Sequence, residues 1–234
     1  MKTETKIGII CAVDTELHPF LPHIQNPVIT KKAMLAFHSG TIHNIPITAV
    51  FCGVGKTNAT IATQILIDTY GATTIINSGS AGGMCDTLQL FDTVICTECA
   101  HHDVHEGILT GFHPYLTSVF IKSCENLTAL SKKAISTLGL TAKTHFGRMV
   151  TGETFIEDDG RADINTQFSP LSVDMETASI AHTCYVNSIP YIAIRTITDT
   201  AIHSGEDTFE KNLPKASEIS KNIVVEILSL LHIY

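Results

Sequence analysis

The stretch Tyr191-Ile192-Ala193-Ile194-Arg195-Thr196-Ile197-Thr198-Asp199 decides the fold class, because an apolar run of strand length leads directly to a carboxylate. Two other apolar runs, Ile7–Ala12 and Leu171–Val173, are soon followed by acids, Glu16 and Glu176. In an open α/β sheet, ligands bind beyond the carboxyl ends of the strands. We therefore expect the three acids to converge on one pocket and to perform general acid–base chemistry on a polar small molecule.

A fourth segment has the same character but ends in small residues. Its strand, Thr73–Asn77, runs into Ser78-Gly79-Ser80-Ala81-Gly82-Gly83, which we interpret as a turn. Small residues in a turn let a ligand approach the backbone closely. This segment is therefore expected to line the same pocket.

Strand and helix patterns alternate along the whole chain, and this alternation predicts an α/β fold. The expected architecture is a three-layer α/β/α sandwich with a central mixed β-sheet covered on both faces. Nothing resembles an interdomain linker, so residues 1–234 are expected to form a single domain. Strands are expected over Ile7–Val13, Met34–Ser39, Ile45–Phe51 (after a turn at Gly40–Asn44), Thr93–Thr97 and Arg148–Thr151, and helices over Glu16–His23, Lys56–Tyr70, Thr117–Leu138, Thr177–Val186 and Lys215–Leu231.

The composition excludes several function classes. Of 234 residues, 44% are hydrophobic and 16% charged, which is enough for a large core. The net charge of −8 and the absence of a Lys/Arg stripe disfavour nucleic-acid and anionic-membrane binding. Met1–Lys6 lacks a signal-peptide pattern, and no apolar run reaches the roughly 18 residues of a membrane span. Most of the seven cysteines lie in apolar runs, typical of reduced thiols in a cytoplasmic protein.

Two motifs resemble known catalytic loops only in part. Gly53-Val54-Gly55-Lys56-Thr57 ends like a phosphate-binding loop, but Val50 occupies the position of the first required glycine. Ser80, flanked by small residues, resembles a nucleophile elbow that Asp199 and His203 could complete as a triad. No helix follows Ser80 directly and no glycine-rich oxyanion segment precedes it, so we do not favour a triad.

The sequence Cys96-Thr97-Glu98-Cys99, followed by His101, His102 and His105, suggests a metal cluster. If both cysteines lie on one strand, their odd separation places them on opposite faces. A second cysteine pair is also missing. We therefore expect no metal, and we interpret the histidines as part of a loop beside a pocket or at the surface. No organic cofactor is expected either.

Each of the three acids also has a structural interpretation. Glu16 could be a helix-surface charge, Glu176 a first-turn acid that complements the helix dipole, and Asp199 a turn residue. Their shared position after apolar strands favours the functional interpretation.

Taken together, the motifs resemble the 5′-methylthioadenosine/S-adenosylhomocysteine nucleosidase family of the nucleoside phosphorylase superfamily. The resemblance spans nearly the whole chain and keeps the order of the motifs. The matching pieces are Ile7-Gly8-Ile9-Ile10 with Glu16, Gly53-Val54-Gly55-Lys56, Asn77–Gly83, Thr151-Gly152-Glu153-Thr154-Phe155-Ile156, Val173-Asp174-Met175-Glu176 and Arg195–Asp199.

The resemblance implies a role for each matching position. Asp199 would protonate N7 of adenine, and Glu16 would activate the attacking water. Glu176 would bind the ribose hydroxyls, with Met175 against the sugar. The remaining substrate-binding residues implied are Ser80, Ala81 and Gly82 on the ribose and water side, Phe155 stacked on adenine, the backbone of Ile156 at the adenine edge, Val173, and Phe209 over the 5′ substituent. A homodimer with a small nucleoside as substrate is implied as well.

The sequence departs from the family pattern at three places, and the third, a loop, bears on substrate preference rather than on reaction type. Val13 replaces the usual methionine, Thr198 replaces the usual serine, and the His101–Tyr115 loop lacks its usual Gly-Gln-x-Pro-Gly-like segment. In the family, this loop shapes the 5′ pocket of the neighbouring subunit. Alternatives are a nucleosidase for another 5′-modified adenosine such as aminofutalosine, a phosphate-dependent phosphorylase, and a non-catalytic adenosine-binding module. Phosphorylases of the superfamily bring arginines to phosphate, and we find none near Gly8 or Ser80 in the sequence.

Overall fold

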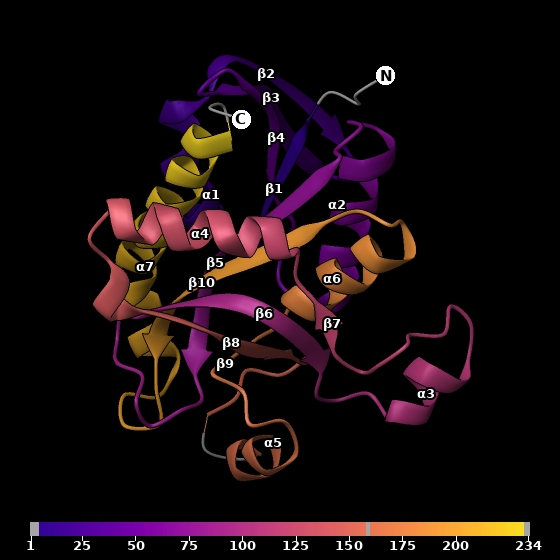
Figure 1. Ribbon diagram of the computed structural model, residues 1–234, viewed down its shortest axis with the longest axis vertical. Helices are drawn as coiled ribbons and strands as arrows, with labels where there is room; N and C mark the ends of the chain where they lie inside the picture. The colour runs from indigo at the N-terminus through magenta and orange to yellow at the C-terminus, as the bar shows by residue number, and fades with distance from the viewer. Residues whose placement is uncertain (1–4, 158–159, 232–234) are drawn as a thin grey trace.

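A mixed β-sheet runs through the molecule (Figure 1), and the computed structural model describes residues 5–157 and 160–231. Of Met1–Lys6, residues 1–4 lie outside these ranges. The described strands are β1 Ile7–Cys11, β2 Gln25–Lys32, β3 Leu35–Ile42, β4 Ile45–Phe51, β5 Thr74–Gly83, β6 Thr93–His101, β7 Ile121–Lys122, β8 Thr144–Thr151, β9 Ser172–Asp174 and β10 Tyr191–Asp199. The helices are α1 Asp14–Leu17, α2 Lys56–Asp68, α3 Glu106–Gly111, α4 Glu125–Thr137, α5 Arg161–Phe168, α6 Thr177–Val186 and α7 Glu206–Leu231, with 3₁₀ turns at His18–His23 and Thr141–Lys143.

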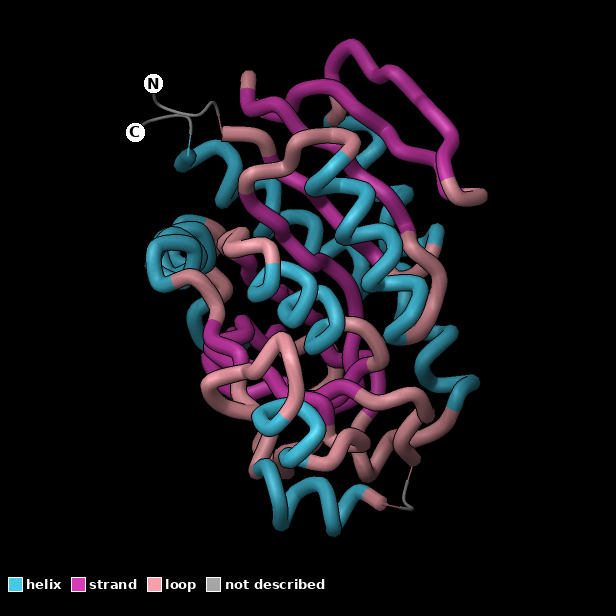
Figure 2. The backbone as a smooth tube through the Cα atoms, turned by 90° about the vertical axis from the view of Figure 1, so that its right-hand side faces the viewer, coloured by secondary structure: helices cyan, strands magenta, loops and turns pink. Residues whose placement is uncertain are grey.

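β5 is the central strand of this sheet. It is parallel to β1 on one side and to β10 on the other, and its last residues pair antiparallel with β9. From β10 the pairing continues through β6 and β8 back to β9, so that five strands close into a ring. From β1 the sheet extends through β4 and β3 to β2, which forms its outer edge (Figure 2).

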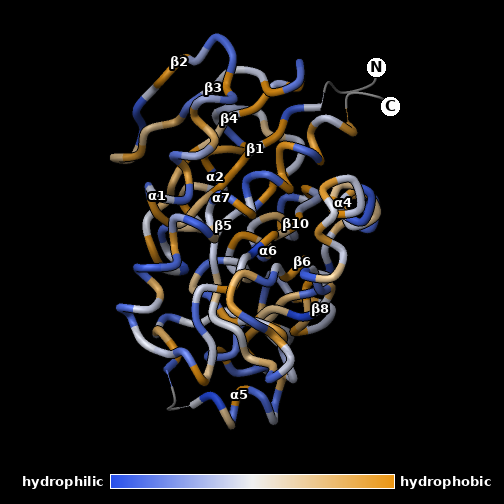
Figure 3. The backbone as a smooth tube through the Cα atoms, turned by 90° about the vertical axis from the view of Figure 1, so that its left-hand side faces the viewer, coloured by the Kyte–Doolittle hydropathy of each residue, from blue (hydrophilic) through white to orange (hydrophobic). Residues whose placement is uncertain are grey.

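Helices cover both faces of the sheet, which confirms the predicted three-layer α/β/α architecture. α2 and α6 pack on one face through buried residues such as Leu66 and Ile180. α1, α4 and α7 pack on the other face, where Leu17, Ile135 and Ile227 are buried. The strands between the two layers are strongly apolar, as the colouring of β1 illustrates (Figure 3). No helix of the described residues is both long and apolar enough to cross a membrane.

The expected turn at Ser78–Gly83 is wrong, because these residues continue β5. They pair with β10 from Ser78↔Ile194 to Gly82↔Asp199, so the small residues lie within the sheet. At Gly79 a Cβ atom would lie 2.6 Å from Glu16 Oε1 and 2.7 Å from Arg195 Nη1. The lack of a side chain at Gly79 therefore lets two charged side chains approach the strand closely, and it is not needed for a turn.

Other element boundaries differ for identifiable reasons. The helix Thr177–Val186 has the expected bounds. The expected helix Thr117–Leu138 starts only at Glu125, since residues 121–122 form β7. The expected five-residue turn Gly40–Asn44 is a tight hairpin, with positive φ at His43 and Asn44.

Several elements were missed or started too late in the sequence analysis, among them β2, α5 and α7. β2 is exposed along its whole length, so it shows no apolar alternation. α5 is short and has no apolar face for a periodic pattern to reveal. α7 begins at Glu206 rather than Lys215 and contains Pro214, a residue type that is unfavourable inside a helix.

The expected separation of Cys96 and Cys99 onto opposite faces is also wrong. In the pairing of β6 with β8, Cys96 faces Gly147 and Glu98 faces Arg148, so Thr97 is an extra residue in a bulge. The bulge resets the alternation, and both cysteines are buried in the same hydrophobic cluster. Cys99 Sγ lies 3.2 Å from the hydroxyl of Tyr191.

Candidate active site

A cavity of about 450 Å³ opens where β1, β5, β9 and β10 meet α7. Its wall also includes Val13, Val54, Asp174 and Arg195, and α7 contributes Glu206 and Glu210. All residues proposed from the sequence as catalytic or substrate-binding lie on it: Glu16, Ser80, Ala81, Gly82, Phe155, Ile156, Val173, Met175, Glu176, Asp199 and Phe209.

Glu16, Glu176 and Asp199 converge on the cavity, but the strands that carry them are not all parallel. Glu16 follows β1 and Asp199 ends β10, and both strands run parallel to β5. β9 runs antiparallel to β5 and pairs only with its last two residues, through Gly82↔Val173 and Gly83↔Ser172. Glu176 therefore enters the pocket from the opposite direction, as the residue that precedes α6.

The carboxylate of Glu16 is held rigidly at the base of the pocket. Its Oε2 accepts a hydrogen bond from Ala12 N at 2.8 Å, and its Oε1 accepts from Ser80 N and Ser80 Oγ, both at 2.8 Å. Only 2% of Glu16 is exposed. The Ser80 hydroxyl is thus committed to Glu16, and Ser80 lies within a strand rather than on a nucleophile elbow.

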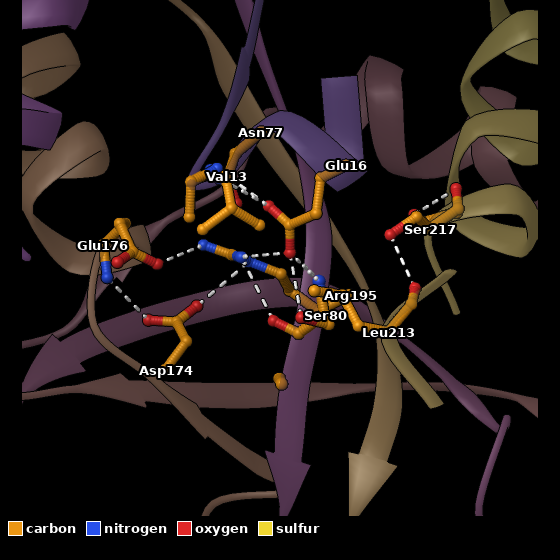
Figure 4. Close-up of polar contacts among 12 residues, drawn as sticks. Val13, Glu16, Asn77, Ser80, Asp174, Glu176, Arg195, Leu213 and Ser217 are labelled. Atoms are coloured by element: carbon orange, nitrogen blue, oxygen red, sulfur yellow. Dashed lines mark hydrogen bonds and ion pairs between the residues drawn. The ribbon is translucent and has the colours of Figure 1, made fainter. Parts of the chain in front are cut away.

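Arg195 lies at the centre of the charged groups (Figure 4). Its guanidinium is 3.1 Å from Glu176 Oε2, 3.2 Å from Asp174 Oδ2 and 3.9 Å from Glu16 Oε1. Its Nη1 also donates to the carbonyl oxygen of Ser80 at 3.1 Å. Burial alone would lower the pKa of Arg195, but the carboxylates of Asp174, Glu176 and Glu16 raise it above its ordinary value.

The expectation that no arginine lies near Ser80 is therefore wrong. Arg195 is distant in sequence, but the β5–β10 register places it opposite Gly79. Its position inside an otherwise apolar strand was the available signal, because a buried guanidinium needs carboxylate partners. Asp174 was missed in the same way, although it is part of the quoted motif.

Asp174 organises the segment that carries Glu176. Its Oδ1 accepts hydrogen bonds from Thr151 Oγ1 at 2.6 Å, Glu176 N at 3.2 Å and Thr177 N at 3.1 Å. Its Oδ2 accepts from the Thr177 hydroxyl and faces Arg195. These bonds fix the start of α6 and thereby the direction of the Glu176 side chain.

Glu176 is buried among other carboxylates. Its Oε1 accepts a hydrogen bond from Gly55 N at 2.9 Å, and its Oε2 faces Arg195. Burial raises the pKa of Glu176 to about 7, an effect that Asp174 and Glu16 reinforce and that Arg195 and the Gly55 amide oppose. A carboxyl with this pKa can both donate and accept a hydrogen bond near neutral pH.

Asp199 has the environment expected of a proton donor. It is 2% exposed, and burial raises its pKa, whereas the Thr198 hydroxyl and the charge of Arg161 lower it. Thr198 Oγ1 donates to Asp199 Oδ1 at 2.9 Å. Asn212 Nδ2 on α7 donates to the Thr198 carbonyl at 2.8 Å and fixes this end of β10.

Two aromatic rings enclose the outer part of the pocket. Phe155 lies on the loop after β8 and Phe209 on α7. Their ring centroids are 6.0 Å apart at an interplanar angle of 72°. An edge-to-face pair of this kind offers an apolar surface to a flat ligand.

The glycine-rich segment before α2 contributes to the site without binding phosphate through its lysine. Gly55 has a positive φ of 101° and directs its amide at Glu176. Lys56 Nζ donates to both carboxylate oxygens of Asp103 at 2.8 Å. Asp103 also accepts from Glu153 N at 3.0 Å, so the lysine ties α2 to the loop that carries Phe155.

The histidines after β6 do not form a cluster with Cys96 and Cys99. His101 is buried with its ring 5.9 Å from that of His182, and burial lowers the pKa of His101 to about 4. His105 Nδ1 instead accepts from Gly107 N at 3.1 Å, at the start of α3. Within residues 5–157 and 160–231, no three His, Cys, Asp or Glu side chains are grouped so that they could hold a metal ion.

Comparison with known proteins places this geometry in context. The family model of the phosphorylase superfamily matches residues 6–229. A 5′-methylthioadenosine/S-adenosylhomocysteine nucleosidase of Pseudoalteromonas translucida is 35% identical over 233 residues, covering 96% of this chain and 97% of the relative.

Two solved structures have nearly the same fold. A nucleosidase of that description from Colwellia psychrerythraea, in complex with adenine, superimposes with a TM-score of 0.89 at 31% identity, covering 98% of this chain and 96% of the other. The futalosine hydrolase of Helicobacter pylori also reaches a TM-score of 0.89, at 25% identity, with 97% and 98% of the two chains covered.

Proposed function

We propose that this chain, which belongs to the phosphorylase superfamily and within it to the family of 5′-methylthioadenosine/S-adenosylhomocysteine nucleosidases, hydrolyses the N-glycosidic bond of those two nucleosides. The products are adenine and the 5′-thio-substituted ribose. 5′-Deoxyadenosine, which has the same base and bond, is a further substrate. The observation that carries this proposal is a pair of buried carboxyl groups on one pocket, Asp199 with a raised pKa and Glu16 held by three hydrogen bonds at 2.8 Å.

The two carboxyl groups have complementary tasks. Cleavage of the bond passes through an oxocarbenium-like state, so the base must leave with a proton while water attacks the sugar. Asp199 donates its proton to N7 of adenine, and burial raises the pKa of this carboxyl and so favours its protonated form. Glu16 accepts a proton from the attacking water, and its fixed carboxylate stabilises the cationic sugar.

The other residues of the pocket position the substrate. Glu176 binds the ribose hydroxyls, and Met175 packs against the sugar. Phe155 stacks on adenine, and the backbone of Ile156 reads its edge, with Val173 beside them on the pocket wall. Ser80, Ala81 and Gly82 line the ribose and water side, and Phe209 covers the 5′ substituent together with Val13 and Val54.

Water rather than phosphate is the nucleophile that this site favours. The arginine beside Ser80 is saturated by Asp174, Glu176, Glu16 and a carbonyl oxygen, so its charge is already balanced. A phosphate at this place would face the carboxylate of Glu16, and like charges at short range repel strongly. Chemistry through a metal or organic cofactor forms no part of the proposal.

A second candidate function is the hydrolysis of a 5′-modified adenosine such as aminofutalosine. The observation that favours it is the equal TM-score of the futalosine hydrolase structure. The His101–Tyr115 segment, which departs from the family pattern, is where the two substrate classes would be distinguished.

We further propose a cytoplasmic homodimer. Residues 106–115, which comprise α3 and the loop after it and are called here the α3 segment, stand away from the body of the molecule (Figure 1). Ile108, Phe112 and Tyr115 of this segment are 58%, 67% and 58% exposed. α2 and α6 lie on the same side of the molecule as α3 (Figure 1), and Ile61 of α2 and Val186 of α6 are exposed. An apolar surface of this kind is typical of an interface. In the dimer, α3 closes the 5′ pocket of the partner.

The experiment is adenine release from a panel of 5′-substituted adenosines, including aminofutalosine, with and without phosphate. We expect release from methylthioadenosine and S-adenosylhomocysteine in phosphate-free buffer, unaffected by EDTA. Strict dependence on phosphate, or loss of activity with EDTA that zinc restores, would refute the proposed reaction. Cleavage of aminofutalosine alone would select the second candidate.

A further inference from the structure

A second buried arginine lies close to the pocket but not on its wall. Arg161 is the first residue of α5 and is 8% exposed. Its Nη1 donates to the carbonyl oxygen of Gly83 and lies 3.3 Å from Met84 Sδ, and its Nε donates to Glu157 O at 3.1 Å. These acceptors are all neutral.

The charge of Arg161 has no fixed counter-ion among the residues that the structure describes. No ion pair with them involves Arg161, and its Nη2 has no hydrogen-bond partner there. Burial of a guanidinium without a carboxylate is strongly unfavourable. Arg195, by contrast, is surrounded by three carboxylates. The burial of Arg161 therefore favours a negative charge close to its guanidinium.

The end of β5 lies between Arg161 and Asp199 and contacts both residues. Gly83, which accepts the Arg161 hydrogen bond, ends β5 beside Gly82, and Gly82 is the Cα partner of Asp199. A Cβ atom at Gly82 would lie 3.0 Å from Asp199 Oδ2, and one at Gly83 would lie 3.4 Å from Asp199 O. Arg161 is thus anchored to Gly83, one of the two glycines against which Asp199 packs.

The charge of Arg161 also acts on Asp199 and favours the ionised form of its carboxyl group. Burial raises the pKa of Asp199, and the Thr198 hydroxyl and Arg161 oppose this rise. The other charged groups on the pocket are the acids Glu206 and Glu210 of α7, and the group of Glu16, Asp174 and Glu176 around Arg195. These acids disfavour a further negative charge in the pocket. Among the described residues, no carboxylate pairs with Arg161, whereas Arg195 is already paired.

We propose that Arg161 is a positioning residue that stabilises the Asp199 carboxylate formed when Asp199 gives its proton to the departing base. This inference rests on the proposed function. The O–H bond of Asp199 breaks and its proton joins N7 of adenine. The electron pair of the C1′–N9 bond passes to the base, water bonds to C1′, and Glu16 takes the proton of the water. The counter-charge of Arg161 thus appears only as the reaction proceeds, so its stabilisation acts on the transition state.

The test is the pH profile of kcat for methylthioadenosine in wild type, Arg161→Gln and Arg161→Lys. Arg148→Gln is the matched control, because Arg148 bonds the Phe168 carbonyl at the other end of α5 and pairs with Glu98. In Arg161→Gln we expect kcat to fall by about 10-fold or more at the acidic plateau. The fall of kcat with rising pH, called here the alkaline limb, should move to higher pH by about half a unit or more. Without the charge of Arg161, Asp199 ionises less readily. Arg161→Lys and Arg148→Gln should keep the wild-type limb.

A nitrophenyl riboside, whose leaving group needs no protonation, separates electrostatic assistance from structural support. Arg161→Gln should cleave it at nearly the wild-type rate. Equal loss on both substrates with an unmoved alkaline limb would show that Arg161 merely anchors α5, and would overturn the inference.

Direct titration of Asp199 by carboxyl ¹³C NMR keeps the inference falsifiable even if the proposed function fails. The pKa of Asp199 should be higher in Arg161→Gln than in wild type. An unchanged pKa would refute the role of Arg161, whereas absence of adenine release from wild type would refute the proposed function alone. Thermal unfolding of each variant confirms that it is folded at the temperature of the assays.

Discussion

Arg195 Nη1 donates a hydrogen bond of 3.1 Å to the carbonyl oxygen of Ser80, from the middle of the strand that ends in Asp199. The same guanidinium faces Glu16, Asp174 and Glu176. One cation thus holds together the carboxylate proposed to activate water, the one proposed to bind ribose, and the residue that orients the latter.

Replacement of Arg195 by methionine should destabilise the protein strongly. It leaves three buried carboxylates without their cation, and removal of one partner from a buried ion pair typically costs about 3–5 kcal/mol. Arg148→Met, which breaks a half-buried pair with Glu98, should cost less. Urea unfolding of the two variants measures the difference. A loss below about 1 kcal/mol for Arg195→Met would mean that the carboxylates do not depend on Arg195.

Gly79→Ala should impair catalysis through displacement of Glu16. The new Cβ would lie 2.6 Å from Glu16 Oε1, closer than packing allows, so the carboxylate or Arg195 must move. We expect kcat to fall by at least about 10²-fold, since small displacements of catalytic groups reduce rates to this extent. Gly139→Ala, after α4 and away from the pocket, where no heavy atom lies within 4 Å of the new Cβ, serves as the control for turnover. Wild-type turnover in Gly79→Ala would contradict the observed packing.

Glu176→Gln should change both turnover and the pH dependence of stability. Burial raises the pKa of Glu176 in the folded protein to about 7 from its ordinary 4.5, so the folded state retains this proton longer than the unfolded state. The resulting stabilisation is full below the unfolded pKa and is lost as the pH rises through 7. Without the carboxyl, the difference in unfolding free energy between pH 5 and pH 7.5 should shrink.

Loss of the Glu176 carboxyl should also lower kcat by at least about 10²-fold, as expected for a group that stabilises the transition state. Near-normal turnover would reduce Glu176 to an acid at the start of α6.

Phe112→Ser tests the proposed dimer. Phe112 is 67% exposed on the α3 segment, and its loss should weaken an interface that depends on apolar contact. Sedimentation equilibrium should show a shift toward monomer together with a higher KM for methylthioadenosine. Met34→Ser, at an exposed position between β2 and β3, should change neither quantity. A wild-type protein that is monomeric and fully active at micromolar concentration would refute the proposal.

The sequence predicted the layers because the central strands and the covering helices have strong apolar patterns. β1 and α6 show this, since every residue of Ile7–Cys11 is buried and α6 has the expected bounds. β2 and α5 escaped prediction because neither has an apolar face to reveal it. The course of β5 through Ser78–Gly83 was missed because glycine and serine favour turns locally, whereas pairing with β10 decides the outcome here.

The sequence allowed us to propose those pocket residues that lie at or soon after the end of a predicted strand. Glu16 and Asp199 were proposed in this way, and both line the cavity. Arg195, Asp174 and Arg161 were not found, because their importance arises from partners brought close only by strand register and by the packing of α5. A bulge at Thr97 likewise changes the faces of Cys96 and Cys99 in a way that residue counting does not anticipate.

The most direct test of the central claim is the effect of Asp199→Asn on two substrates that differ in leaving group. An amide cannot deliver a proton to N7, so cleavage of methylthioadenosine should fall by at least about 10²–10⁴-fold, the range typical of general-acid catalysis. In wild type the same rate should decline as the pH rises through the raised pKa of Asp199, because the proton is then lost. A nitrophenyl riboside should be cleaved by Asp199→Asn at nearly the wild-type rate. Equal loss on both substrates would contradict the assignment and leave Asp199 as a residue that only orients substrate or supports the fold.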